Sequence, residues 1–274
     1  MTRATLAEVL APARRDGYAV AGLVCQGWED ARAYVAAAEA EGAPVILQAG
    51  PGARAHVPVP VWGAMFRALA EGASVPVVAH LDHGHDIADC RAAIAAGFTS
   101  VMYDGSALPL AENIARTAQV AAMARAAGVS CEGEIGVVGY AEGAASRGTD
   151  PEEAARFARD TGVDAVAVSI GNIHLQRDAA TRIDRALLAA IEAGVDRPLV
   201  LHGGSGLAPA DRAWLARDTA VCKLNIGTEL RQAFGGTLRA VLAGDTDLFD
   251  RIEILNRCHD PLVAAARQVI AGLR

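Results

Sequence analysis

The sequence predicts an α/β fold in which eight strand–helix units close into a (β/α)8 TIM barrel, with extra C-terminal helices. Apolar runs of strand length alternate with longer helical patterns along the 274 residues, at about 34 residues per unit. These runs are apolar throughout, which is typical of parallel strands covered on both faces. No linker or low-complexity tract interrupts the chain, so we expect a single domain over residues 1–274. An open, doubly wound sheet is the alternative.

The predicted elements follow one another in a regular order. A helix over residues 4–15 is expected before the first strand. The eight predicted strands are Tyr18–Val24, Pro44–Gln48, Pro76–His80, Thr99–Tyr103, Val129–Glu134, Ala165–Ser169, Pro198–His202 and Ala220–Asn225. Apolar residues at i, i+3 and i+4 predict helices near residues 29–41, 60–72, 86–96, 109–127, 151–161, 183–193, 208–217 and 227–243. The stretch from Asp245 to Arg274 is expected to add helices beyond the eighth unit.

Residues that begin and end helices support this phasing. Asp150 precedes Pro151, which is the order of an N-cap carboxylate and a proline at the first helical position. Helices are predicted to end before a strand at three glycines, Gly97, Gly128 and Gly194. The loop from Gly136 to Thr149 is long and rich in glycine, so it is the best candidate for a lid.

Charge and hydropathy exclude several classes of function. The net charge is -7 and no basic stripe is present, so no nucleic-acid partner is expected. No apolar run reaches the roughly 18 residues of a membrane span, and no signal-peptide pattern begins the sequence. Five cysteines without paired spacing are expected to be reduced and mostly buried. We therefore expect a cytoplasmic protein with no membrane partner.

Histidines and carboxylates gather at the C-terminal ends of the predicted strands. Five of the seven histidines lie at or just beyond three of these ends. In a barrel these ends form one face, where active sites lie. His83, His174 and His202 are the natural metal triad, because three imidazoles plus an open position form a catalytic zinc site. Asp104 and Glu134 are candidates for an alternate or second metal position.

The other histidines are interpreted differently. A single histidine is most simply explained as a buried, hydrogen-bonded residue, and only the repeated placement of three favours a metal site. His80 lies inside its strand, so we expect a structural role. His56 and His259 lie outside the pattern and are expected to be surface residues.

Two glycine-containing turns follow the seventh and eighth predicted strands. They are His202-Gly203-Gly204-Ser205-Gly206 and Lys223-Leu224-Asn225-Ile226-Gly227-Thr228. Backbone N–H groups in such turns, together with a helix N-terminus, bind phosphate, and barrels commonly place phosphate at these two loops. One such turn would be weak evidence because tight turns need glycine anyway. Two in adjacent units favour a phosphate site.

Taken together, these residues resemble the class II, metal-dependent ketose-bisphosphate aldolases, which include the fructose- and tagatose-bisphosphate aldolases. The matching segments occur in the family's order over about residues 17–230. They are Gly17-Tyr18-Ala19-Val20, Pro44-Val45-Ile46-Leu47-Gln48, His80-Leu81-Asp82-His83-Gly84, Asp104-Gly105-Ser106, Glu132-Gly133-Glu134-Ile135-Gly136, Thr149-Asp150-Pro151-Glu152-Glu153-Ala154, Ile170-Gly171-Asn172-Ile173-His174, His202-Gly203-Gly204-Ser205-Gly206 and Lys223-Leu224-Asn225-Ile226.

The resemblance implies an enzyme that reversibly cleaves a phosphorylated ketose into dihydroxyacetone phosphate and an aldehyde. The implied zinc ligands are His83, His174 and His202. Asp104 and Glu134 would line the metal site, where a second divalent or monovalent cation could also bind. Zinc would stabilise the enediolate that forms when the carbon–carbon bond breaks, an effect worth several kcal/mol.

The resemblance also assigns the proton transfers and the substrate contacts. Asp82 would take the proton of the C4 hydroxyl, which typically contributes 10²–10⁴-fold. Glu142, in the lid, would protonate the enediolate while the lid excludes water. The dihydroxyacetone phosphate half would contact Gly171, Gly203, Ser205, Asn225, Gly227 and Thr228. Relatives are usually dimers or tetramers, so a homo-oligomer is implied.

Several positions depart from the family pattern. Where the family usually has Phe-Asn near the end of the first strand, this sequence has Leu23-Val24-Cys25-Gln26. Gln48 is followed by Ala49-Gly50, so the serine expected at the third position is absent. Leu175 replaces a glycine that contributes to the near phosphate site. Metal and proton-transfer residues remain while the distal pocket has changed, so the aldehyde half is expected to differ from glyceraldehyde 3-phosphate. Candidates for specificity are Gln48, Gly50 and His85, with Arg54 and His56 as further readers of that half.

Three other functions stay open at this point. Lys223, the only lysine, could form a Schiff base in a metal-independent aldolase, although a structural role is the simpler reading. A non-catalytic barrel that supports an aldolase partner is the second. Metal-assisted hydrolysis is the third, because His83-Gly84-His85 resembles a hydrolase H-x-H motif. That motif lies in the third unit, whereas hydrolases carry it at the first strand.

Overall fold

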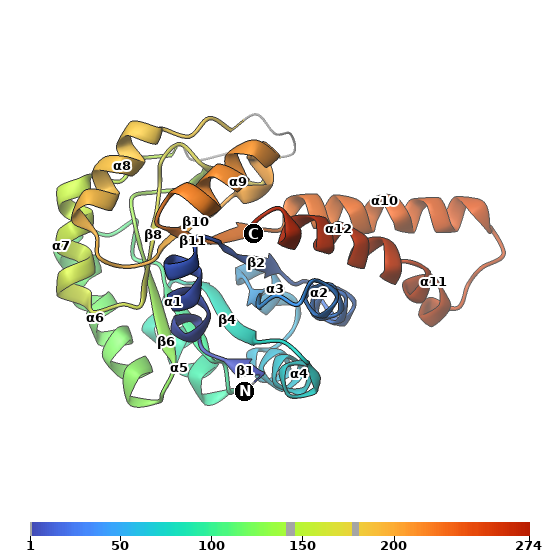
Figure 1. Ribbon diagram of the computed structural model, residues 1–274. Coiled ribbons are helices and arrows are strands. Elements are labelled where there is room, and N and C mark those ends of the chain that lie inside the picture. The colour runs from blue at the N-terminus through green and yellow to red at the C-terminus, as the bar shows by residue number, and fades with distance from the viewer. Residues whose placement is uncertain (1, 141–145, 177–180) are drawn as a thin grey trace.

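Eight parallel strands close into a barrel in the computed structural model, which describes residues 2–140, 146–176 and 181–274 (Figure 1). The barrel strands are β2 (Val20–Val24), β3 (Val45–Ala49), β4 (Val77–Gly84), β5 (Ser100–Tyr103), β6 (Ser130–Ile135), β8 (Ala165–Val168), β10 (Leu199–Leu201) and β11 (Val221–Ile226). β11 pairs with β2, and β4 pairs with β5, so the sheet has no free edge. The predicted (β/α)8 barrel is confirmed, and the open sheet is wrong.

Helices surround the barrel, and their bounds agree with the predicted ranges to within two residues. They are α2 (Trp28–Glu41), α4 (Val59–Gly72), α5 (Ile87–Ala95), α6 (Leu110–Ala126), α7 (Pro151–Thr161), α8 (Arg185–Gly194), α9 (Pro209–Asp218) and α10 (Thr228–Gly244). The side chain of Asp150 accepts a hydrogen bond from the N–H of Glu153, which confirms the predicted N-cap. Gly97 and Gly128 have φ values of 91° and 69°, as glycines beyond a helix end do. The prediction for Gly194 is wrong, because it is the last residue of α8 and Val195 is the cap.

The N-terminal end of the barrel is closed by a helix. α1 (Leu6–Asp16) begins with a capping box in which the Thr5 side chain accepts from the N–H of Glu8 and Glu8 bonds back to Thr5. Its apolar side chains pack on Val20, Ile46 and other residues of the barrel interior. A short strand, β1 (Arg3–Ala4), precedes it and pairs with β4. The barrel is thus filled from this end, which leaves its opposite end for a functional site.

The C-terminal helices form an arm that projects from the barrel (Figure 1). α10 runs outward, α11 (Arg251–Arg257) lies near the tip, and α12 (His259–Ala271) returns to pack against α2. This confirms the prediction of extra C-terminal helices. Leu230 is the one buried residue of α10, and Phe249 near the tip is 91% exposed. No helix in the described part of the chain has the length and apolarity needed to cross a membrane.

Four short elements at the C-terminal end of the barrel were not expected from the sequence. α3 (Pro51–His56) follows β3, and a 3-10 turn (Gly204–Gly206) follows β10. β7 (Gly139–Tyr140), at the start of the predicted lid, pairs in parallel with β9 (Ile173–His174). Each holds too few residues for a periodic pattern to reveal it. Glu142 and the centre of the predicted lid lie outside the described residues.

Candidate active site

A pocket opens at the C-terminal end of the barrel, where the strand ends meet. Residues from several strands and from the turns after them line it, among them Asp82, His83, His174, Ser205, Asn225 and Arg231. Five of these six side chains were singled out in the sequence. The walls come from distant parts of the chain, so only the closed barrel brings them together.

β4 places two consecutive residues in this pocket. Neighbouring side chains of a regular strand point to opposite faces, so Asp82 and His83 could not both face the pocket from a regular β4. The pairing of β4 with β5 shifts register between Leu81 and Gly84, and His83 has a φ of 49°. This bulge turns both side chains into the site. The predicted strand end at His80 was therefore too early, because β4 continues through the bulge to Gly84.

Three imidazoles converge beside a carboxylate cluster. The ring centres of His83 and His202 are 4.6 Å apart, and His174 lies 5.1 Å from the first and 5.5 Å from the second. The three rings offer nitrogen atoms within 4.8 Å of one another. His83, Asp104 and Glu134 form a second group under the same limit. The predicted metal ligands thus come together, and His83 belongs to both groups.

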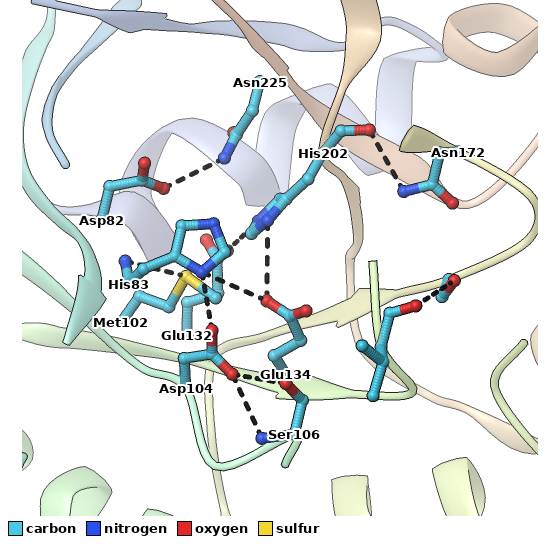
Figure 2. Close-up of polar contacts among 12 residues, drawn as sticks. Asp82, His83, Met102, Asp104, Ser106, Glu132, Glu134, Asn172, His202 and Asn225 are labelled. Carbon is cyan, nitrogen blue, oxygen red and sulfur yellow. Dashed lines mark hydrogen bonds and ion pairs between the residues drawn. The ribbon is translucent and has the colours of Figure 1, made fainter. Parts of the chain in front are cut away.

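The donor atoms fit a cation. Oε2 of Glu134 lies 3.6 Å from Nδ1 of His83 and 3.6 Å from Nδ1 of His202 (Figure 2). Nδ1 of His202 and Oε2 of Glu134 are both buried, and neither has a hydrogen-bond partner among the described residues. Buried polar atoms are nearly always paired, and two unpaired buried acceptors that face one another fit a cation site. The site therefore fits a divalent metal held by imidazoles, with carboxylates beside it.

In the metal-free protein, burial and the charges of neighbouring groups determine which of these side chains hold a proton. Burial and the neighbouring His83 lower the pKa of His174 to about 4 and that of His202 well below its usual value. Burial opposes charge on His83 too, but Asp82 and the 2.7 Å hydrogen bond with Asp104 raise its pKa to about 10. Burial and the charge of Asp104 raise the pKa of Glu134 well above its usual range. Two imidazoles are thus already in the neutral form that metals bind.

Metal binding is expected to release protons and to strengthen as pH rises. His83 has its pKa at about 10 in the metal-free protein, so below that pH its ring must lose a proton before it can act as a ligand. One competing proton makes the apparent affinity rise about tenfold per pH unit. Titration calorimetry with a divalent metal between pH 6 and 8, in buffers of different ionisation enthalpy, would count the released protons. An affinity independent of pH would contradict this assignment.

A fully buried network stands behind His202. Its Nε2 bonds Oε1 of Glu132 at 3.2 Å, and Nζ of Lys223 donates to Oε2 of Glu132 at 2.7 Å. Lys223 also lies 3.2 Å from Nε2 of His80, whose Nδ1 bonds the hydroxyl of Ser100. Because Nε2 of His202 bonds the carboxylate of Glu132, the lone pair of Nδ1 is left free to face the candidate metal site. The structural role predicted for His80 is confirmed.

Lys223 does not line the pocket, and its side chain is 0% exposed. Its ammonium group lies between Glu132 and His80, inside the barrel. A lysine that forms a Schiff base must reach the substrate carbonyl as a free amine. The geometry therefore contradicts the Schiff-base alternative and supports the structural reading.

The side-chain amide of Asn225 holds Asp82 near the candidate metal site. Nδ2 of Asn225 donates to Oδ1 of Asp82 at 3.2 Å (Figure 2). Although burial opposes it, the charge on His83 keeps the pKa of Asp82 below its usual value. A Cβ atom at Gly50 would lie 3.3 Å from Oδ2 of Asp82, so a side chain here would press on this carboxylate. Asp82 is therefore an ionised carboxylate that faces the pocket.

The predicted phosphate residues separate into two sets. Gly203, Ser205, Asn225, Gly227 and Thr228 line the pocket, whereas Gly171 does not. Gly171 has a φ of 99°, and a Cβ atom there would lie 2.6 Å from the carbonyl oxygen of Arg182. Backbone geometry explains this glycine, and its contact with the phosphate stays a prediction.

The two glycine turns form one unit. Oγ of Ser205 accepts from the N–H groups of Gly227 and Glu229, each at 3.3 Å. Gly203 has a φ of 68°, and a Cβ atom there would lie 2.2 Å from the carbonyl oxygen of Ile173. Leu175, which lines the same pocket, has a φ of 58° and is 50% exposed. A leucine in this backbone conformation is strained, and such strain concentrates at functional sites.

The specificity candidates lie at different depths. Gly50 lines the pocket, while the amide of Gln48 is fully buried beneath it with both polar atoms unpaired among the described residues. The ring of His85 is 63% exposed, and its Nδ1 lies 3.7 Å from Oδ2 of Asp104. His56 is exposed and His259 half-buried, and neither lines the pocket.

Arg231 and Arg54 were not identified correctly from the sequence. Arg231, in the first turns of α10, lines the pocket, and its Nε is buried and unpaired among the described residues. It follows Thr228 by three residues, so it lies on the same face of the helix, and this spacing was the available signal. Arg54 does not line the pocket, and its guanidinium group bonds backbone carbonyls instead.

Comparisons with known proteins agree with this geometry. The family model described as "Fructose-bisphosphate aldolase class-II" matches residues 4–274. A 6-phospho-5-dehydro-2-deoxy-D-gluconate aldolase from Shouchella clausii is 38% identical over 253 residues, which are 89% of this chain and 85% of that protein. A fructose-bisphosphate aldolase from Geobacillus stearothermophilus is 36% identical over 271 residues, 96% of this chain and 94% of that protein.

Solved structures resemble the chain over nearly its whole length. The crystal structure of the YdjI aldolase from Escherichia coli K12 has a TM-score of 0.84 and 28% identity, covering 98% of this chain and 96% of that one. A structure titled as a putative fructose-1,6-biphosphate aldolase from Coccidioides immitis has a TM-score of 0.86 and 24% identity, covering 98% and 95%. The second likeness supports the fold alone.

Proposed function

Because the chain belongs to the class II fructose-bisphosphate aldolase family and is therefore a metal-dependent aldolase, we propose that it uses zinc to cleave a phosphorylated ketose other than fructose 1,6-bisphosphate. The main support for the zinc site is a pair of buried atoms that have no hydrogen-bond partner among the described residues. They are Nδ1 of His202 and Oε2 of Glu134, beside the histidine cluster. His83, His174 and His202 are the proposed ligands. Asp104 and Glu134 are proposed to hold the alternate or second cation position.

Each proton transfer has a proposed residue. A bound zinc ion supplies a Lewis acid for the carbonyl and hydroxyl oxygens of the ketose. Asp82, ionised and oriented by Asn225, takes the proton from the C4 hydroxyl as the bond between C3 and C4 breaks. The C3 carbon of the enediolate then needs a proton, and Glu142 is proposed to deliver it from the lid. Closure of the lid would exclude water from this step.

The near phosphate is proposed to bind where the two glycine turns meet. Gly203, Ser205 and Thr228 line this part of the pocket, beside the N-terminus of α10. The positive end of that helix favours an anion. The bonds from Gly227 and Glu229 to Ser205 fix the turn before a ligand arrives, which lowers the entropy cost of binding.

The far end of the substrate is proposed to carry an anion that Arg231 recognises. Arg231 is the permanently charged cation of the pocket lining, and the buried Nε offers an unused donor. A guanidinium group pairs equally well with a carboxylate or a phosphate. The relative named as a phospho-deoxygluconate aldolase acts on a sugar acid, which makes a carboxylate at this end a good candidate.

A substrate comparison tests this specificity. Release of dihydroxyacetone phosphate would be measured with fructose 1,6-bisphosphate, tagatose 1,6-bisphosphate and 6-phospho-5-dehydro-2-deoxy-D-gluconate. We expect the phosphorylated sugar acid to give the highest kcat/KM. Fructose 1,6-bisphosphate as the best substrate by a wide margin would contradict the proposal. Zinc content without turnover of any of the three would favour a non-catalytic barrel that supports a partner.

We also propose a homo-oligomer, a dimer or a tetramer. Apolar side chains are exposed on and beside the C-terminal arm, including Trp28, Phe249 and Ile252. Large exposed apolar groups that lie together often mark protein–protein contacts. Light scattering after size-exclusion chromatography would give the mass, and a monomer would contradict this proposal.

A further inference from the structure

Arg54 joins the ends of two neighbouring strands. It lies on α3, directly after β3, and its guanidinium group is partly buried. Nη1 donates to the carbonyl oxygen of Ala49 at 2.7 Å and to that of Asp82 at 2.6 Å. Nη2 donates to the carbonyl oxygen of His83 at 2.9 Å. One side chain thus bonds the last residue of β3 and both residues of the β4 bulge.

The bulge needs such a partner. A regular strand directs its carbonyl groups to neighbouring strands, but the shifted register between Leu81 and Gly84 interrupts this pattern beside β5. Carbonyl groups withdrawn from a sheet must be bonded elsewhere or lose free energy. His83 also holds a φ of 49°, which is unfavourable for a residue with a Cβ atom and persists only when the surroundings fix it.

Arg54 is itself held in place. Ala53 is buried, and its carbonyl oxygen accepts from Nε1 of Trp62 on α4 at 3.2 Å. The N–H of Val57 also donates to this carbonyl at 2.9 Å. The backbone beside Arg54 is therefore fixed to the core. The planar guanidinium group of an arginine with a fixed backbone restricts the positions of two carbonyl groups more than the flexible ammonium group of a lysine would.

We propose that Arg54 is a positioning residue that holds the Asp82–His83 bulge, so that the proton acceptor and a metal ligand face the same pocket from consecutive positions. The inference rests on the proposed roles of Asp82 and His83. It replaces the expectation that Arg54 reads the aldehyde half of the substrate. It also explains why an arginine comes directly after β3. Its side chain reaches the neighbouring strand β4, which holds two functional side chains at consecutive positions.

Three variants test this proposal, namely Arg54→Ala, Arg54→Lys and the control Arg91→Ala, an exposed arginine on α5. Displacing catalytic groups by about 1 Å costs about 10²-fold in rate, so we expect Arg54→Ala to lower kcat by about that factor with a smaller change in KM. Loss of an outer group around a metal site typically weakens metal binding about 10- to 100-fold, and zinc affinity should fall within this range. Arg54→Lys should be intermediate, and Arg91→Ala unchanged.

Chemical rescue separates positioning from a general loss of stability. Guanidinium at millimolar concentration should restore part of kcat and of zinc affinity in Arg54→Ala, but not in wild type or Arg91→Ala. Unchanged zinc affinity and kcat in Arg54→Ala, or losses that follow thermal stability and show no rescue, would overturn the proposal. If Arg54→Ala does not fold, zinc affinity of Arg54→Lys decides, and a wild-type value overturns it. Failure of wild type to cleave any ketose phosphate would refute the proposed function instead, because zinc affinity is measured without substrate.

Discussion

Replacing His202 with alanine is expected to abolish turnover and to weaken zinc binding more than any other single substitution in the site. Nδ1 of His202 is fully buried and faces Oε2 of Glu134. Alanine at this position would remove a proposed metal ligand and offer no other donor atom in its place. The Lewis-acid contribution that depends on this ligand is worth several kcal/mol. The substitution also leaves Glu132 without one of its two buried partners. Zinc content by elemental analysis and steady-state rates would measure both losses.

The matched control is His56→Ala. His56 is exposed and does not line the pocket, so its removal should leave zinc content and kcat at wild-type values. Treating the wild-type enzyme with a chelator should inactivate it, and added zinc should restore activity. Full activity of His202→Ala, or activity that survives chelation, would show that the reaction does not depend on this metal site.

Replacing Asp82 with asparagine is expected to lower kcat by about 10²–10⁴-fold while zinc remains bound. The substitution keeps the shape of the side chain but removes the charge that is proposed to accept the C4 hydroxyl proton. Asn225 donates to the Asp82 carboxylate, and an asparagine can accept the same bond through its oxygen, so the pocket should keep its form. Rates measured with the best ketose phosphate, together with zinc content, would test this.

The control for this charge is Asp218→Asn, an exposed carboxylate at the end of α9. It should be indistinguishable from wild type. Zinc loss in Asp82→Asn comparable to that in His202→Ala would assign Asp82 a structural part in the metal site. Wild-type kcat with bound zinc would exclude Asp82 as the proton acceptor.

The sequence predicted the barrel and the clustering of three histidines because both depend on regular patterns. Alternating apolar runs set the strand and helix order, and the parallel sheet then brought the strand ends together. His83, His174 and His202 were therefore found from their positions after strands. The resemblance to a known family added the roles of Asp82 and Glu142, which no periodicity could supply.

The remaining features depend on contacts that no local pattern encodes. The bulge in β4 lies within a continuous strand, and nothing before the structure showed that Arg54 supports it. Gly171 follows the family's segment, yet its place is set by the carbonyl of Arg182. Glu132 is part of a matching motif, but its pairing with Lys223 joins residues 91 positions apart. Such pairs become visible only when the barrel is closed.

The burial of Lys223 has a practical consequence for handling the protein. It is the only lysine in the chain, and its ammonium group lies inside the barrel, 0% exposed. Reagents that acylate or cross-link amines therefore find no lysine of this sequence on the folded surface. Labelling of Lys223 would report that the barrel has opened.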